Sequence, residues 1–159
     1  MSRIIQIEID DSHATPPTPE MEQDRRIAIF DLIEDNRFVI PGREGQPAPQ
    51  GPFRLVLCIR ERRLVFDLSA PEGGRLAEFH LSMGPFRQVT KDYFQICQSY
   101  FDAVKRLPPA QIEAIDMARR GIHNEGARTL QERLDGKADL DLDTARRLFT
   151  LICTLMPQG

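Results

Sequence analysis

GPFRQVTKDYFQICQSYFDAVKRLPPAQ (residues 84–111) runs directly into IEAIDMARRGIHNEGARTLQERL (112–134), and this stretch decides the fold. At 100° per residue, the apolar side chains of its first half fall on one stripe, which predicts a long helix lying on a core. The stripe consists of Phe86, Val89, Tyr93, Ile96, Cys97, Tyr100, Val104 and Leu107. Leu107-Pro108-Pro109 ends the helix, because the residue before a proline is disfavoured in the α region.

The second half predicts another amphipathic helix, from about Pro109 to residue 135, with polar residues in the middle of its apolar face. If the helix is continuous, Asp116, Arg119 and His123 lie close to the centre of that face. The alternative is a break at Gly121, which would end one helix as a left-handed cap. The sequence allows both interpretations and slightly favours the break.

Upstream, the chain predicts one strand, one helix and then a run of strands. Residues 3–9 alternate, with Ile5, Ile7 and Ile9 expected on one face and Ile4 on the other. Thr18-Pro19-Glu20 is typical of a helix start, and the helix is expected to reach about residue 35. Segments 53–60, 63–69 and 77–83 each alternate in hydrophobicity and are joined by short turns, which predicts an antiparallel meander.

Downstream, DGKADLDLDT (135–144) offers Asp141 or Asp143 as the cap of a last helix. Arg146, Arg147, Thr150 and Thr154 are expected on the polar side of that helix. The predicted class is therefore α+β: an N-terminal strand and helix, an antiparallel β-meander, then three to four helices packed on the sheet. Residues 1–159 are expected to form a single domain, with flexible segments at 10–19 and 41–52.

Composition excludes several classes of protein. The formal net charge of −3 over 159 residues gives no general nucleic-acid footprint. The three cysteines are far apart in apolar runs, so no disulfide framework or metal site is expected. The N-terminus has no signal-peptide pattern, and no segment approaches the length of a membrane span. We expect a cytoplasmic protein that does not contact a membrane.

The candidate site is the polar segment around Gly121. No nucleotide-binding, hydrolase or zinc-protease motif occurs in the chain, and no cofactor is predicted. His123 and Glu125 are the catalytic candidates, since an imidazole and a carboxylate are the usual proton-transfer groups. An anionic ligand, phosphorylated or carboxylated, would bind nearby, through the candidate residues Asp116, Arg119, Arg120, Asn124 and Arg128. The competing interpretation is an internal polar network that only fixes helix geometry.

The strings GPFRQVTKDYFQICQSYFDAVKRLPPAQIEAIDMARRGIHNEGARTLQERLDGK and DTARRLFTLI, with IAIFDLIE and RLVFDLS, resemble an uncharacterised family of small bacterial proteins known only by a placeholder family number. The resemblance spans nearly the whole chain and implies a bacterial, soluble, single-domain protein. It implies no activity and no site residue.

These observations rank the possible functions. A non-catalytic binding or regulatory protein comes first, with an unknown protein partner or a second copy of itself. A small enzyme acting on an anionic substrate through His123 and Glu125 comes second, so whether the chain is an enzyme stays open. RNA binding through arginine-rich helix faces comes last, because the chain is mildly acidic.

Overall fold

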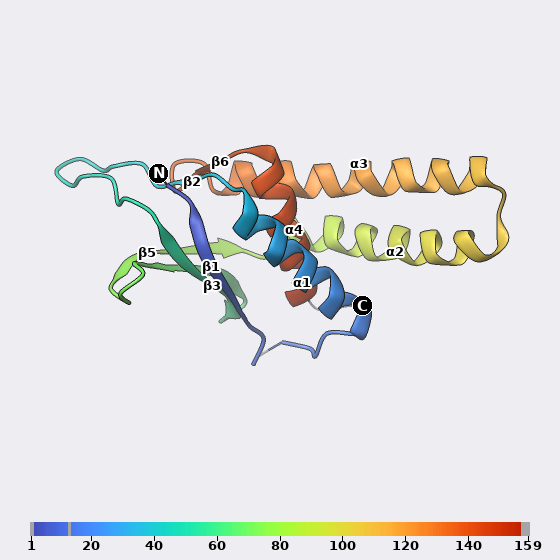
Figure 1. The fold of residues 1–159 in the computed structure, drawn as a ribbon, viewed down its shortest axis with the longest axis horizontal. Coiled ribbons are helices and arrows are strands. Elements are labelled where there is room, and N and C mark those ends of the chain that lie inside the picture. The colour runs from blue at the N-terminus through green and yellow to red at the C-terminus, as the bar shows by residue number, and fades with distance from the viewer. Residues whose placement is uncertain (1, 13, 157–159) are drawn as a thin grey trace.

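The computed structural model describes residues 2–12 and 14–156, which form one sheet, a short second ladder and four helices. The α+β class and the predicted order of elements are confirmed (Figure 1). The elements are β1 (Ile4–Asp10), α1 (Pro19–Glu34), β2 (Phe38–Val39), β3 (Phe53–Arg60), β4 (Arg63–Ser69), β5 (Arg75–Ser82), α2 (Gly84–Arg106), α3 (Pro109–Arg133), β6 (Asp139–Leu140) and α4 (Leu142–Leu155). The single-domain organisation and the mobility of 10–19 and 41–52 stay predictions.

The four-stranded sheet has the order β1-β3-β4-β5. The meander is confirmed: β3 pairs with β4 and β4 with β5, both antiparallel, whereas β1 pairs with β3 in parallel. Leu57 lies opposite Phe66, and Phe66 lies opposite Phe79, so large apolar side chains line one face. β2 and β6 form a separate two-residue ladder that ties the segment after α1 to the segment before α4.

The predicted alternation of β1 is wrong at its first residues. The register shifts between Ile4 and Gln6, where a bulge adds one residue to the strand. Ile4 and Ile7 are therefore both buried, whereas Ile5 is 38% exposed. A strict period of two cannot anticipate an inserted residue, and so the prediction that Ile5 and Ile7 share a face fails here.

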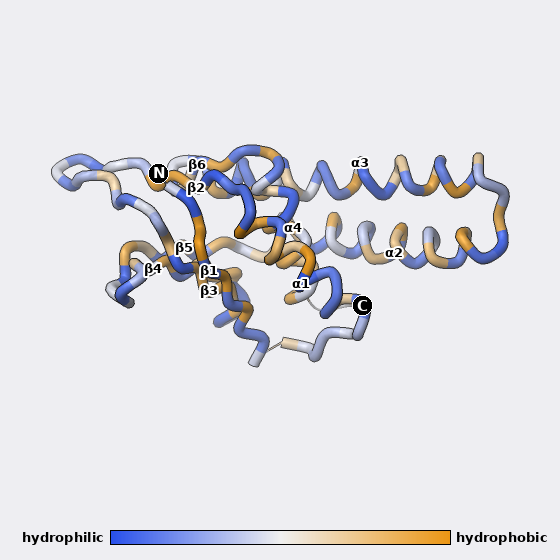
Figure 2. The backbone as a smooth tube through the Cα atoms, viewed as in Figure 1, coloured by the Kyte–Doolittle hydropathy of each residue, from blue (hydrophilic) through white to orange (hydrophobic). Residues whose placement is uncertain are grey.

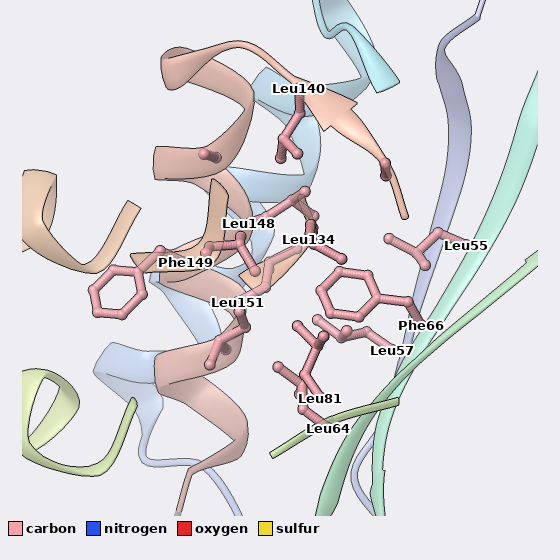
Figure 3. Close-up of a cluster of buried hydrophobic side chains, with 14 of the residues drawn as sticks. Leu55, Leu57, Leu64, Phe66, Leu81, Leu134, Leu140, Leu148, Phe149 and Leu151 are labelled. Atoms are coloured by element: carbon pink, nitrogen blue, oxygen red, sulfur yellow. The ribbon is translucent and has the colours of Figure 1, made fainter. Parts of the chain in front are cut away.

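Helix α4 lies at the centre of the core, between the sheet on one side and α1 and α3 on the other. Leu148 and Leu151 point toward Leu57 and Phe66 of the strands (Figure 3). Asp141 is the N-cap, since its carboxylate accepts a hydrogen bond of 3.0 Å from the backbone N–H of Thr144. The first of the two predicted caps is thus the one used.

Helix α1 covers α4 and is joined to it by an arginine. The Nε–H of Arg25 donates to the Thr154 hydroxyl at 3.1 Å, and its Nη2 donates to the Thr154 carbonyl at 3.2 Å. The same guanidinium forms an ion pair of 2.9 Å with Asp11 in the segment before the helix. Thr18 caps α1 as predicted, because its hydroxyl accepts from the Met21 N–H at 3.2 Å.

Helices α2 and α3 form an antiparallel hairpin whose outer half extends beyond the rest of the molecule (Figure 1). Helix α3 is continuous through Gly121, so the favoured break is wrong and the alternative of a continuous helix holds. The φ angle of Gly121 is not positive, so this residue is not a left-handed helix cap. Helix α3 packs along α2, and this packing supports it as one continuous helix. None of the helices in residues 2–12 and 14–156 is long and apolar enough to cross a membrane.

Two glycines in α3 should respond to alanine in opposite ways. A Cβ at Gly121 would meet no atom within 4 Å, so Gly121→Ala should raise the free energy of unfolding by about 0.5–1 kcal/mol. A Cβ at Gly126 would approach Phe149 Cζ to 2.2 Å, so Gly126→Ala should lower it by about 1–3 kcal/mol or more. Urea unfolding of both variants measures the contrast. A loss of stability in Gly121→Ala would contradict a continuous α3.

Candidate functional site

A pocket of about 350 Å³ lies between α1 and α4, and α2 and α3 each contribute one side chain to its lining. Its lining is mostly polar, with two apolar side chains from α1. The lining residues are Asp24, Ile27, Ala28, Asp31, Tyr93, His123, Asp143, Arg146, Arg147 and Thr150.

His123 reaches this pocket because α3 and α4 approach very closely one turn further along. Gly126 lies against the Phe149 ring, where any side chain would overlap the ring. Residues three apart share a helix face, so the same contact turns His123 toward α4. There its Nε2 lies 2.8 Å from the Thr150 hydroxyl, and its ring packs on Tyr93 and Phe149 at centroid distances of 5.1 and 5.4 Å.

The hydrogen bonds of Thr150 fix the proton on His123. The Thr150 hydroxyl donates to the Arg146 carbonyl at 3.3 Å, so its oxygen accepts a hydrogen bond from the imidazole N–H. His123 then carries its hydrogen on Nε2. Burial lowers the pKa of His123 to about 4, and the positive charges of Arg146 and Arg119 act in the same direction. The imidazole is therefore neutral at pH 7.

The two arginines of the pocket differ in how they are used. Arg147 donates to the carbonyl oxygens of Asp35 at 3.0 Å and Asp31 at 3.4 Å, so it binds the C-terminal end of α1. Arg146 makes only a long contact of 3.7 Å with Asp143. Its Nε is buried and has no hydrogen-bond partner among the described residues. Arg146 is the cation best placed to bind a ligand.

Helix α1 brings acidic side chains to the opposite wall of the pocket. Desolvation by burial raises the pKa of Asp24, while the charge of Arg119 opposes that shift. Asp31 lines the same wall. Across the described residues, neither carboxylate forms an ion pair with Arg146. Carboxylates on α1 thus lie across the pocket from the arginines of α4, and the pocket as a whole does not carry a net positive charge.

Asp116 and Arg119 form a closed network on the hairpin. The Arg119 Nε–H donates to the Asp116 carboxylate at 3.1 Å and its Nη2 donates at 2.5 Å. Arg120 adds an ion pair of 2.9 Å. The hydrogen bond from Arg119 lowers the pKa of Asp116, and the Arg119 guanidinium lies 5.0 Å from the centre of the Tyr100 ring. Asp116 does not line the pocket.

The predicted site is thus divided. Asn124 is half-buried, and its Oδ1 has no hydrogen-bond partner among the described residues. Glu125 and Arg128 are exposed and do not line the pocket. Two residues along a helix correspond to a rotation of about 200°, so Glu125 points away from His123. The structure does not bring the two catalytic candidates together.

Sequence reasoning missed the residues that complete the pocket. The sequence predicts Arg146, Arg147 and Thr150 only as residues of the polar side of the last helix, and it does not single out Asp24 and Asp31. The same prediction is wrong for Thr154, which is buried because Arg25 of α1 covers it. Their spacing on α4 and α1 was visible, yet only the packing of α1 on α4 brings them together. No group of three or more potential metal ligands occurs in the part of the chain that the structure describes.

Comparison with known proteins identifies the family. Residues 1–158 match the family described as "Uncharacterised protein family (UPF0262)". The chain belongs to the UPF0262 family. The resemblance seen in the sequence is therefore confirmed, and it is a resemblance to a family with no assigned function.

UPF0262 relatives match over almost their entire length. A "UPF0262 protein" of Paracoccus denitrificans is 72% identical over 98% of this chain and 96% of its own. One from Dinoroseobacter shibae is 72% identical over 98% of both chains. "UPF0262 protein SPOA0072" of Ruegeria pomeroyi is 67% identical over 98% of this chain and 96% of its own. No solved structure matches this chain.

The lowered pKa of His123 predicts how stability depends on pH. Its folded-state pKa of about 4 lies below the ordinary value of 6.5, so between these values the unfolded chain binds a proton that the folded chain does not. The contribution of the neutral His123 to the free energy of unfolding is complete above pH 6.5 and is lost as the pH falls to about 4. This contribution should be about 3 kcal/mol.

The measurement is urea unfolding from about pH 7 to pH 4.5 for the wild type and His123→Gln. Glutamine can still donate to Thr150, while other titrating groups are common to both proteins. The difference between the two curves should therefore isolate His123. Parallel curves, or an imidazole that titrates near 6.5 by NMR, would show that the ring is not desolvated.

Proposed function

We propose that this UPF0262 protein is a non-catalytic binding protein whose hairpin α2–α3 packs against an apolar segment of another protein. The observation that carries the proposal is the apolar row on the outer half of α2. Phe101 is 51% exposed and Val104 is 53% exposed, on a helix that extends past the body of the molecule (Figure 1). Exposed apolar groups that follow one line are typical of interaction sites.

This row continues the stripe that packs α2 on the core. Tyr93, Cys97, Phe101 and Val104 follow one another at intervals of four, four and three residues, so they share a face. Tyr93 packs against Phe149 of α4, and Cys97 is half-buried. Phe101 and Val104, further out, are exposed to solvent. Figure 2 shows hydrophobic positions recurring along α2 to the end of the hairpin. A partner segment would supply the packing that α4 supplies further in.

The state of His123 argues against catalysis. A general base works best when its pKa is near the working pH, and a pKa of about 4 makes this imidazole a weak base. Its Nε2 is engaged with Thr150, and Glu125 lies on the other side of the helix. The arrangement supports the internal-network interpretation for this part of the chain.

The arginines give little support to RNA binding. Arg25, Arg60, Arg75, Arg119 and Arg120 all form ion pairs with carboxylates, so much of their charge is neutralised locally. The net charge of −3 adds to this. As part of the proposal we place the protein in the cytoplasm. Its free cysteines, Cys58, Cys97 and Cys153, support a reducing compartment.

The hairpin proposal can be tested by photo-crosslinking inside a bacterium that encodes this chain. A photoreactive amino acid replaces Lys105, which follows Val104 at the exposed edge of the row. We expect a discrete adduct with one protein, because side chains at the rim of an interface lie against the partner. The adduct should vanish in Phe101→Ser/Val104→Ser, whose own fold should be unchanged because both side chains are exposed.

A photoreactive group at Glu125 is the matched control, since that position is exposed but off the row. It should give no such adduct. The proposal fails if position 105 gives no adduct, or if the adduct persists when both apolar side chains are replaced.

A second candidate is a small anionic ligand in the pocket, which the unpartnered Nε of Arg146 favours. The carboxylates of Asp24, Asp31 and Asp143 around the same space oppose an anion. We therefore expect no rise in melting temperature with millimolar phosphate or succinate. A rise in the wild type that Arg146→Gln abolishes would move this candidate to first place.

A further inference from the structure

We propose that two copies of this chain form a symmetric dimer through the outer face of α1, with the two helices antiparallel and Phe30 at the centre. This surface is separate from the hairpin row, so the inference goes beyond the binding function proposed above. It adds a partner of defined identity, a second copy of the same chain.

The outer face of α1 carries a row of uncovered apolar side chains. Ile27 is 51% exposed, Phe30 is 65% exposed and Ile33 is 38% exposed, at intervals of three residues. The buried side of the same helix is made by Ala28 and Leu32, which pack into the core. Helix α1 is therefore apolar on two sides, of which only one is covered by the core. An apolar side that the core does not cover is typical of a helix that packs against a second surface.

The sequence of α1 is self-complementary about Phe30. In an antiparallel pair related by a two-fold axis at Phe30, a residue n positions before it lies level with the residue n positions after it in the other copy. Ile27 then lies level with Ile33, and Phe30 with Phe30. Each exposed apolar side chain of the row thus lies level with an apolar side chain of the other copy.

The charged residues follow the same symmetry. Arg26 and Glu34 each lie four residues from Phe30, or about 6 Å along the helix axis. In the pair, each Arg26 lies level with Glu34 of the other copy, which gives two ion pairs around the apolar centre. Both residues are exposed, and neither forms an ion pair within the described part of its own chain.

This arrangement identifies a second copy rather than an unrelated protein. A surface that binds something else has no reason to be complementary to itself, whereas a two-fold interface must be. The row on α2 is not self-complementary. If a two-fold axis is placed at the midpoint of Phe101 and Val104, Lys105 lies level with Tyr100 of the other copy, and no pair of opposite charges forms. Charge complementarity thus distinguishes the apolar row on α1 from the one on α2.

Sedimentation velocity of the full chain over a wide range of concentration tests the dimer. We expect a dimer for the wild type, and Phe30→Ser should weaken it by roughly tenfold or more because it removes the central side chain. Met117→Ser is the matched control, since Met117 on the hairpin is also 65% exposed. It should leave the dimer unchanged.

Charge reversal tests the symmetry itself. Arg26→Glu and Glu34→Arg should each weaken self-association, because each places like charges opposite one another. Mixing these two variants should restore a dimer. In the mixed pair the introduced glutamate of one variant lies opposite the introduced arginine of the other, and the unchanged Glu34 and Arg26 also face each other. Lys91→Glu, an exposed change on α2, should have no effect.

Three results would overturn the inference: a wild type that stays monomeric at all concentrations, a dimer insensitive to Phe30→Ser, or charge variants that do not recover on mixing. None of these bears on the hairpin, whose crosslinking depends on Phe101 and Val104. Conversely, the loss of the hairpin adduct would leave the dimer through α1 standing. The two proposals therefore fail separately.

Discussion

The approach of α3 to α4 at Gly126 and Phe149 is the contact on which the arrangement of the helices depends. A Cβ on residue 126 would lie 2.2 Å from Phe149 Cζ, so only glycine permits this separation. The contact places α3 beside the core helix, and α2 follows because it packs along α3. It also turns His123 toward Thr150. The hairpin and the pocket are thus two consequences of one close approach.

The features that sequence reasoning predicted correctly are those set by neighbours in the chain. The meander, and the caps at Thr18 and Asp141, depend on periods or on contacts within a few residues. The α2 stripe is right only for its first half, because Val104 and Leu107 at its outer end are exposed. The predictions that are wrong concern features that depend on contacts between segments far apart in the sequence. The bulge in β1 depends on its pairing with β3, and the continuity of α3 through Gly121 depends on support from α2. Propensity at one glycine could not outweigh that support.

The candidate site divides in the same way. The pairing of Asp116 with Arg119 lies within one helix turn, so its spacing alone could predict it. The hydrogen bond between His123 and Thr150 spans 27 residues, and the pocket adds α1 from the other end of the chain. Nothing local to α4 marks Arg146 as the arginine of the pocket with an unsatisfied donor. Arg146 lines the pocket because α1 and α3 both pack against α4.

The distribution of polar and apolar groups is the basis of the proposal that the protein binds rather than catalyses. Where catalysis would need a group able to gain or lose a proton at neutral pH, the molecule holds a neutral imidazole by burial and by a hydrogen bond. Where solubility would favour polar surface, it presents phenylalanine, isoleucine and valine on α1 and α2. Exposed apolar rows are typical of surfaces that bind a partner, and this is the basis of both proposals. The two rows differ in one respect: the pattern on α1 is self-complementary, whereas the uncovered end of the α2 stripe is not. We therefore propose an identical chain as the partner of α1 and a different protein as the partner of α2.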